Sequence, residues 1–354
     1  MKTTLQSGPF AHADHRVDRT MLTVLLALLP ATLFNLWLFG LPAILLFACT
    51  LGAALGFEAL WLAATGRDAR AGLADGSAAI TGWLLALSLP PWAPWWLGVL
   101  GAFIAIVIAK HAYGGLGQNL FNPAMVARVA LLVSFPVIMT AWVAPQPLFT
   151  ERAASVAQSF AVLGQGVPDT MVSATPLGHV KTELSRALPA SQSAADAPAL
   201  PDLLLGRRAG SMGETSVLLI LAGGLFLLWR RVITWHIPVA LLGSLFAAAQ
   251  LASLADPARY TDGLFHLLTG ASFLGAFFIA TDYVTSPMSP RGKLIYGAGC
   301  GFLTWAIRSY AGYPEGMAFA VLLMNALTPI IDQYTRPRVF GRQRNGEPLP
   351  LRPF

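Results

Sequence analysis

The stretch from Met21 to Phe39 reads MLTVLLALLPATLFNLWLF and decides the fold class of the chain. It carries no charged residue, and a second apolar run, 41–64, follows after one glycine. A helix needs about twenty mostly apolar residues to cross the hydrocarbon core of a bilayer. The two runs therefore predict two consecutive transmembrane helices.

The rest of the chain repeats this pattern. Of its 354 residues, 55% are apolar and only 11% are charged, too few charges to cover a soluble protein of this length. Further candidate spans are 76–89, 95–109, 122–143, 215–229, 233–254, 263–279, 294–307 and 317–331. We predict an all-α polytopic membrane protein with about ten transmembrane helices, some of them interrupted at Gly or Pro.

The basic residues orient these spans. With a cytoplasmic N-terminus, most of the 23 Lys and Arg residues fall in cytoplasmic segments, as the positive-inside rule requires. We predict a cytoplasmic segment 1–20, a five-helix membrane half 21–143, a loop 144–212 outside the cytoplasm, a second five-helix half 213–334 and a basic cytoplasmic tail 335–354.

An odd number of crossings in each half means that any structural repeat between the halves is inverted. Ile80–Gly82 resembles Leu268–Gly270, and Tyr113–Gly115 resembles Tyr310–Gly312. Matches this short also arise by chance, so the repeat and chance remain open as explanations. A real repeat would place a binding site where interrupted helices meet in mid-membrane.

Charge and cysteine content exclude some classes of function. The net charge of +6 does not form a basic stripe interleaved with aromatic residues, so no nucleic-acid partner is expected. Cys49 and Cys300 are lone thiols in apolar runs, which gives neither a disulfide framework nor a metal-cluster motif. We expect no bound metal and no complete catalytic set of side chains.

Two segments of the first half carry chemistry-bearing residues. Arg128 lies within the fifth predicted span, where an unpaired guanidinium is costly and a partner or a phosphate is expected. The glycine-rich segment 114–122 contains Gly114, Gly115, Gly117, Asn119 and Asn122 and ends at a predicted helix start. This segment is either a tight turn between helices or a cofactor-lining backbone. Lys110, just before it, is expected to cap a helix end.

The loop 144–212 is rich in small residues and has too few large apolar side chains to fold independently, so we expect it to be ordered by what it lies against. Within it, Asp169–Leu177 places a carboxylate six residues before a threonine. On the residues alone this segment is an exposed turn. At the sixth span, Glu214 and Thr215 read as a helix cap, because an acidic first turn suits the helix dipole.

Four segments together resemble a known family: Tyr113–Met125, Asp169–Leu177, Phe277–Pro287 and Ile307–Asn325. They are similar to the D subunit of the Rnf electron-transport complex, itself similar to the B subunit of the sodium-translocating NADH:quinone oxidoreductase. The likeness covers nearly the whole chain, including the Arg-rich segment Tyr334–Gly341.

The resemblance implies a covalent flavin. In the family, a flavin transferase esterifies the phosphate of FMN to the threonine of a motif Asp-x-x-Ser/Thr-Gly-Ala-Thr, and that threonine is Thr175 here. Asp169 and Ala174 match the motif, whereas Val172 replaces its hydroxyl residue and Ser173 its glycine. The basic-residue pattern and the family both place Thr175 outside the cytoplasm.

The resemblance further implies an inner-membrane complex that couples electron transfer between ferredoxin and NAD to ion translocation. Its partners would be the other subunits, the transferase during maturation and the surrounding membrane lipid. A second, noncovalent flavin such as riboflavin, and a cofactor beside Glu214 and Thr215, rest on the same likeness. Without the resemblance, a ten-helix solute channel or transporter fits the span pattern equally well.

Overall fold

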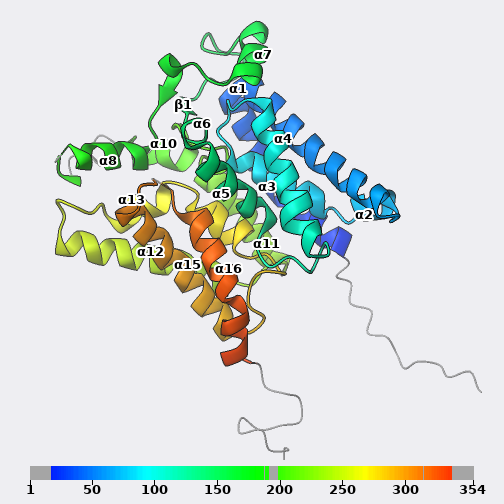
Figure 1. Ribbon diagram of the computed structural model, residues 1–354. Helices are drawn as coiled ribbons and strands as arrows, with labels where there is room; N and C mark the ends of the chain where they lie inside the picture. The colour runs from blue at the N-terminus through cyan, green and yellow to red at the C-terminus, as the bar shows by residue number, and fades with distance from the viewer. Residues whose placement is uncertain (1–16, 187, 191–197, 314, 337–354) are drawn as a thin grey trace, which may run out of the picture.

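The computed structural model describes residues 17–186, 188–190, 198–313 and 315–336. They form an all-α protein, as predicted, in which one strand pair is seen, β1 (Trp142–Val143) with β2 (Val172–Ser173) (Figure 1). Residues 1–16 of the predicted N-terminal segment and residues 337–354 of the predicted basic tail lie outside the described residues.

Helix α1 (Val17–Ala64) contains the first two predicted spans. It is broken at Gly40, whose φ of 77° and ψ of −164° are not helical. A Cβ at Gly40 would lie 3.1 Å from the backbone oxygen of Gln146, and the amide of Gln146 donates to the oxygen of Leu38 at 3.0 Å. A glycine therefore allows the chain to turn between two helical arms and the loop to pack against the turn.

The first half continues with α2 (Ala69–Leu73), α3 (Ser77–Ser88) and α4 (Trp95–Phe103). Helix α4 runs into a π-helical segment η1 (Ile104–Lys110) and a 3₁₀ turn η2 (His111–Tyr113), followed by α5 (Pro123–Ser134) and α6 (Pro136–Met139). The predicted fifth span, 122–143, is too long. Pro136 ends α5, because a residue before proline is driven out of the helical region, and Phe135 has φ −131° and ψ 56°.

The long loop forms short elements that lie on the helical body: α7 (Val156–Gln165), η3 (Asp169–Met171), α8 (Pro176–Ser185) and α10 (Leu200–Leu205). Val162 of α7 packs with Trp92 from the turn between α3 and α4. Leu177 and Val180 of α8 pack on Phe265 of the second half. Part of the apolar surface of the loop is thus buried against the membrane helices, whereas other large apolar side chains of the loop, such as Phe149 and Phe160, are exposed.

The second half comprises α11 (Val217–Trp229), α12 (His236–Ala255), α13 (Gly263–Leu268), α14 (Ser272–Leu274), a π-helical segment η4 (Gly275–Ile279), α15 (Pro290–Tyr310) and α16 (Met317–Tyr334). The eighth predicted span is interrupted between α13 and α14, where Gly270 has φ 66°. Ile80–Gly82, the proposed counterpart of this break, lies inside the unbroken α3, so the paired motifs do not mark equivalent breaks. Tyr113 and Tyr310, in contrast, each end a helix that precedes α5 or α16.

One hydrophobic core joins the two halves, including Leu28 and Leu85 from the first and Leu241 and Cys300 from the second. Helix α1 packs on α11, and α5 packs on α16. Within the described residues, α1, Trp95–Tyr113, α12 and α16 are long and apolar enough to cross a membrane, and α3, α5 and α11 are shorter apolar helices. Figure 1 shows α7 and β1 at one end of this body, the loop end, and the last turn of α16 at the opposite end.

Candidate functional site

Thr175 lies where β2 passes into α8. β2 pairs antiparallel with β1, Ser173 opposite Trp142, and this pairing fixes the chain just before the threonine. Thr175 is the N-cap of α8: its φ of −71° and ψ of 157° are extended, and its Oγ1 accepts from the amide of Gly178 at 3.0 Å. Pro176 at the first helical position suits such a start. The side chain is 6% exposed, so the sequence-based description of this segment as an exposed turn is wrong for Thr175.

A lysine fastens α8 to the second half. The Nζ of Lys181 donates to the backbone oxygens of Arg308 at 3.2 Å and Tyr313 at 3.0 Å, and also to that of Ala311. These carbonyls lie at and just beyond the C-terminal end of α15, which favours a cation. Burial lowers the pKa of Lys181. Together with the packing on Phe265, this contact holds the start of α8 in place.

A cavity of about 280 Å³ adjoins the start of α8, and we call it the α8 cavity. The residues that line it include the motif residues Ser173 and Ala174, the helix residues Pro176 and His179, and the pair Arg207 and Arg208. No acidic residue of the described part of the chain lines it. The cavity next to Thr175 is therefore cationic.

Arg208 is buried beside this cavity at 3% exposure. Its Nη2 donates to the backbone oxygen of Glu214 at 2.5 Å, while its Nη1 has no hydrogen-bond partner among the described residues. Burial is the largest effect on this group and lowers the pKa of Arg208 to about 10, so it is still protonated at neutral pH. A buried guanidinium with an unused donor suits an anionic ligand.

Arg128 has the partner that the sequence required. Its Nη2 lies 3.5 Å from Oε1 of Glu214, both side chains being 6% exposed, and its Nη1 donates to the backbone oxygen of Ser88. The Oγ of Ser211 also donates to Glu214 Oε1, at 2.8 Å. The structure thus brings together two predicted site residues, although neither lines the α8 cavity.

The cap predicted at Glu214 and Thr215 is wrong. Helix α11 begins at Val217 and its N-cap is Ser216, so Glu214 lies before the helix and pairs with arginine. Thr215 is fully buried and its hydroxyl contacts Oδ1 of Asn35 in α1. Thr215 does not line the α8 cavity.

Asp169 is separated from the α8 cavity. It is an exposed residue at the first position of η3 and lines a different hollow, about 110 Å³, with Trp92 and Pro94. The structure therefore gives Asp169 no direct part in the α8 cavity.

The glycine-rich segment lies apart from the α8 cavity. Gly114, Gly115 and Gly117 have φ values of 117°, 102° and 87°, which side chains other than hydrogen rarely allow. Asn122 caps α5, because its Oδ1 accepts from the amides of Ala124 at 3.1 Å and Met125 at 3.3 Å. The three glycines shape a tight turn and do not line the α8 cavity, whereas the asparagines that follow line a cavity of their own.

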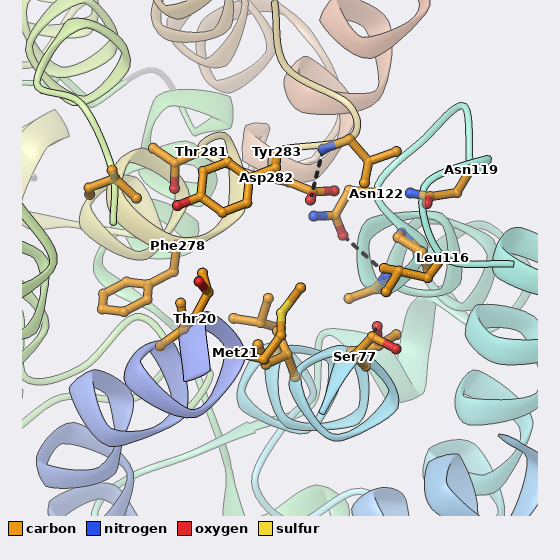
Figure 2. Close-up of a pocket in the computed structure, with 18 of the residues that line it drawn as sticks. Thr20, Met21, Ser77, Leu116, Asn119, Asn122, Phe278, Thr281, Asp282 and Tyr283 are labelled. Atoms are coloured by element: carbon orange, nitrogen blue, oxygen red, sulfur yellow. Dashed lines mark hydrogen bonds between the residues drawn. The ribbon is translucent and has the colours of Figure 1, made fainter. Parts of the chain in front are cut away.

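Asn119 and Asn122 line this second cavity of about 100 Å³, which we call the asparagine cavity (Figure 2). Figure 2 shows Met21 of α1 and Ser77 of α3 on one side and Asp282 on the other. The Oδ1 of Asp282 accepts from the amide of Val284 at 3.4 Å, and burial raises the pKa of Asp282. The cavity lies between the two halves and combines aromatic, amide and carboxyl groups.

A buried ion-pair cluster borders the asparagine cavity. The Nζ of Lys110 lies 2.8 Å from Oε2 of Glu58 and donates to Ser77 Oγ at 2.8 Å. The Nε2 of His111 lies 2.9 Å from the same carboxylate oxygen, and its ring stacks on Trp61. Lys110 is thus an internal ion-pair partner, and its predicted role as a helix-end cap is wrong.

Sequence reasoning missed the two arginines of the α8 cavity. Arg207 and Arg208 enter the prediction only as topology signals, although two adjacent guanidiniums in a loop of small residues are a local signal for anion binding. His179, one turn into α8, gives no signal of its own. Among the described residues, no three His, Cys, Asp or Glu side chains are grouped so as to hold a metal ion.

The fold and the two cavities define a class: a polytopic helical membrane protein with a cationic cavity on its long loop and a second cavity between its halves. The chain belongs to the NQR2, RnfD, RnfE family, which residues 4–341 match. The family resemblance drawn from the sequence motifs is therefore confirmed.

Curated relatives match over nearly their whole length. A protein of Stutzerimonas stutzeri is 52% identical over 335 residues, 94% of this chain and 94% of that protein. One of Halorhodospira halophila (strain DSM 244 / SL1) is 48% identical over 349 residues, 98% of this chain and 97% of that protein. One of Escherichia coli (strain SE11) is 44% identical, covering 96% of this chain and 99% of that protein. Each is named as the D subunit of an ion-translocating oxidoreductase complex.

Proposed function

We propose that this chain is the flavin-bearing membrane subunit of an Rnf-type complex, which couples electron transfer between ferredoxin and NAD to ion translocation. The observation that carries this proposal is the near full-length match to relatives named as the D subunit of an ion-translocating oxidoreductase complex. The chain has no nucleotide-binding motif or cysteine cluster in its sequence, so it needs the other subunits to complete the reaction.

FMN esterified through its phosphate to Thr175 is the proposed cofactor. The residues present suit it: the threonine precedes a helix of ten residues, a cationic cavity adjoins the start of that helix, and Nη1 of the buried Arg208 has no hydrogen-bond partner within the described part of the chain. When bound, the flavin supplies the redox chemistry. The protein's own part is to hold the phosphate near fixed cations and amides, which keeps the attachment point in one place.

Maturation must expose the threonine. Thr175 is 6% exposed and its hydroxyl is engaged by the amide of Gly178, so a transferase cannot reach it in the docked structure. We propose that the transferase acts before α8 docks on the second half, or when its first turn opens. The α8 cavity then receives the phosphate when α8 docks on the second half.

The proposed membrane is a bacterial inner membrane, with both termini in the cytoplasm and the 144–212 loop in the periplasm. The distribution of basic residues supports this orientation. The first turn of α1 and the loop after η4 line the same cavity, and Asp332 near the end of α16 accepts from the amide of Met288 in that loop. Figure 1 shows both described ends of the chain on the side of the body away from α7.

The asparagine cavity is the proposed seat of the second, noncovalent flavin, such as riboflavin. Its support is the lining, in which Phe277 and Phe278 offer aromatic surface and Asn119 and Asn122 offer amide groups. At about 100 Å³ it is smaller than the roughly 300 Å³ at the low end for small-molecule sites, so side chains such as Met21 must move to admit a flavin ring.

In-gel fluorescence tests the proposed function. The chain is expressed with a flavin transferase, purified in detergent, denatured and separated on a gel, and we expect an ultraviolet-excited flavin band. Thr175→Ala should remove the band, whereas the matched control Thr170→Ala, an exposed threonine five residues earlier, should keep it. A dark wild-type band contradicts the flavin role and favours a channel or transporter without redox function.

A further inference from the structure

The charge around the α8 cavity is not balanced. Arg208 is influenced electrostatically by Glu214, Arg308 and Glu315. Glu214 already lies against Arg128, and Glu315 pairs with Arg308 at 2.9 Å. This leaves Arg208 with only a backbone oxygen as its hydrogen-bond partner among the described residues. A buried cation with no carboxylate of its own is costly unless an anion completes the site.

The start of α8 adds a second source of positive potential at the same place. The helix runs from Pro176 to Ser185, and its N-terminal amides point back toward the residues that line the cavity. Arg207, an exposed residue, and His179 complete the lining on this side. The helix dipole, two guanidiniums and a histidine thus lie around a hollow that Ala174 and Pro176, the chain neighbours of Thr175, also line.

The other contacts of the loop do not explain this arrangement. Lys181 and the apolar contact with Phe265 hold α8, and the β1–β2 pairing holds the preceding chain. The carboxylates of Glu214 and Glu315 favour a charged Arg208, but they also pair with Arg128 and Arg308. Among the described residues, this group thus holds three buried arginines and two carboxylates, which leaves one positive charge without a counter-charge. The cation is therefore best explained by an anionic group in the cavity.

We propose that the α8 cavity binds the phosphate through which a flavin is attached to Thr175, and that Arg208 is the positioning residue that holds this phosphate. This inference rests on the proposed function, because it requires the attached FMN. A phosphodiester keeps one negative charge, which an arginine can engage with two donors. Arg207 contributes a second, solvent-screened cation at the rim.

The test compares variants in two forms of the chain, one carrying the flavin and one made unable to carry it by Thr175→Ala. The variants are Arg208→Gln, Arg208→Lys and Arg207→Gln. The matched control is Arg186→Gln, which removes an exposed arginine just after α8 that pairs with Glu183. Denaturing-gel fluorescence first establishes attachment in each flavin-bearing preparation. A dark wild-type band defeats the proposed function itself and is thereby distinguished from failure of the present inference.

Two readouts then follow in detergent: quenching of flavin fluorescence by the neutral quencher acrylamide, and the thermal unfolding midpoint. We expect Arg208→Gln to raise the fraction of chains with an unbound flavin phosphate about tenfold, because one charge-assisted hydrogen bond is lost. Acrylamide should then quench the flavin more strongly. Arg207→Gln should give a smaller rise, and Arg186→Gln none.

The midpoint separates positioning from structure. Arg208→Gln should lower the unfolding midpoint more in the flavin-bearing chain than in the Thr175→Ala chain. An equal drop in both forms, with wild-type quenching, assigns Arg208 a structural role and overturns the inference. If Arg208→Gln does not fold, Arg208→Lys decides by the same comparison, because it keeps the charge but loses the planar guanidinium and its Nη1 donor.

Discussion

Replacing Lys181 by methionine should release α8 from the second half. The ammonium donates to three backbone oxygens around the end of α15, and hydrogen bonds to a charged group are worth about 1.5–3 kcal/mol. Burial of the ammonium, which lowers the pKa of Lys181, offsets part of this gain. A net loss of about 1.4 kcal/mol raises the undocked fraction of α8 about tenfold.

Thiol labelling measures this opening. Val180 is 6% exposed on the docked face of α8, so Val180→Cys in a Cys49→Ser background reports undocking, because the remaining Cys300 is fully buried. We expect a maleimide to label the Lys181→Met chain about ten times faster than its parent. Arg186→Met, which removes an exposed arginine at the end of the same helix, is the control and should leave the rate unchanged. Equal labelling rates for parent and Lys181→Met would refute the role given to this lysine.

Three further perturbations address other parts of the structure. Glu58→Gln removes the carboxylate shared by Lys110 and His111, both 3% exposed, and should destabilise the chain by about 3–5 kcal/mol, seen as a lower thermal midpoint. The Glu58→Gln, Lys110→Met double variant should recover part of the lost stability, and a midpoint no higher than that of Glu58→Gln would contradict the ion pair. Gly40→Ala forces a side chain into φ 77° and should cost about 1 kcal/mol or more, whereas Gly52→Ala in the same helix, with open space around its Cβ position, should not lower the midpoint; equal midpoints would contradict the strained turn. Because the pKa of Arg208 is lowered to about 10, its cation persists at neutral pH and is lost as the pH rises through that value. A bound phosphate raises this pKa further, because a nearby negative charge favours the cation. Protection of the flavin from acrylamide should therefore stay constant from about pH 7 to about pH 9, and a loss of protection within this range would contradict Arg208 as its source.

The helical spans could be predicted because lipid demands long apolar runs, which composition reveals directly. The turn at Gly40 lies between the first two predicted spans. The break around Gly270 lies within the eighth predicted span. The end of α5 was misplaced because Trp142 and Val143 are as apolar as the helix before them, and only the local effect of Pro136 decides where the helix stops.

Sequence motifs and the cost of buried charge point to individual site residues, whereas their partners depend on packing. The family motif points to Thr175, whose flavin attachment stays a prediction, and Arg128 was expected to need a partner because a lone guanidinium in the membrane is costly. The identity of the carboxylate that pairs with Arg128 depends on the path of segment 206–216. This path places Glu214 beside Arg128 and not at the N-cap of α11. The same fold-back buries Arg208 beside α8, a contact between segments that no local pattern encodes.

Peptide mass spectrometry of the chain isolated within its assembled, active complex tests the central claim most directly. The peptide spanning Thr175 should carry the mass of an esterified FMN, and fragmentation should locate that mass on Thr175 and not on Thr170 or Ser173. An unmodified peptide from an active complex would contradict the account.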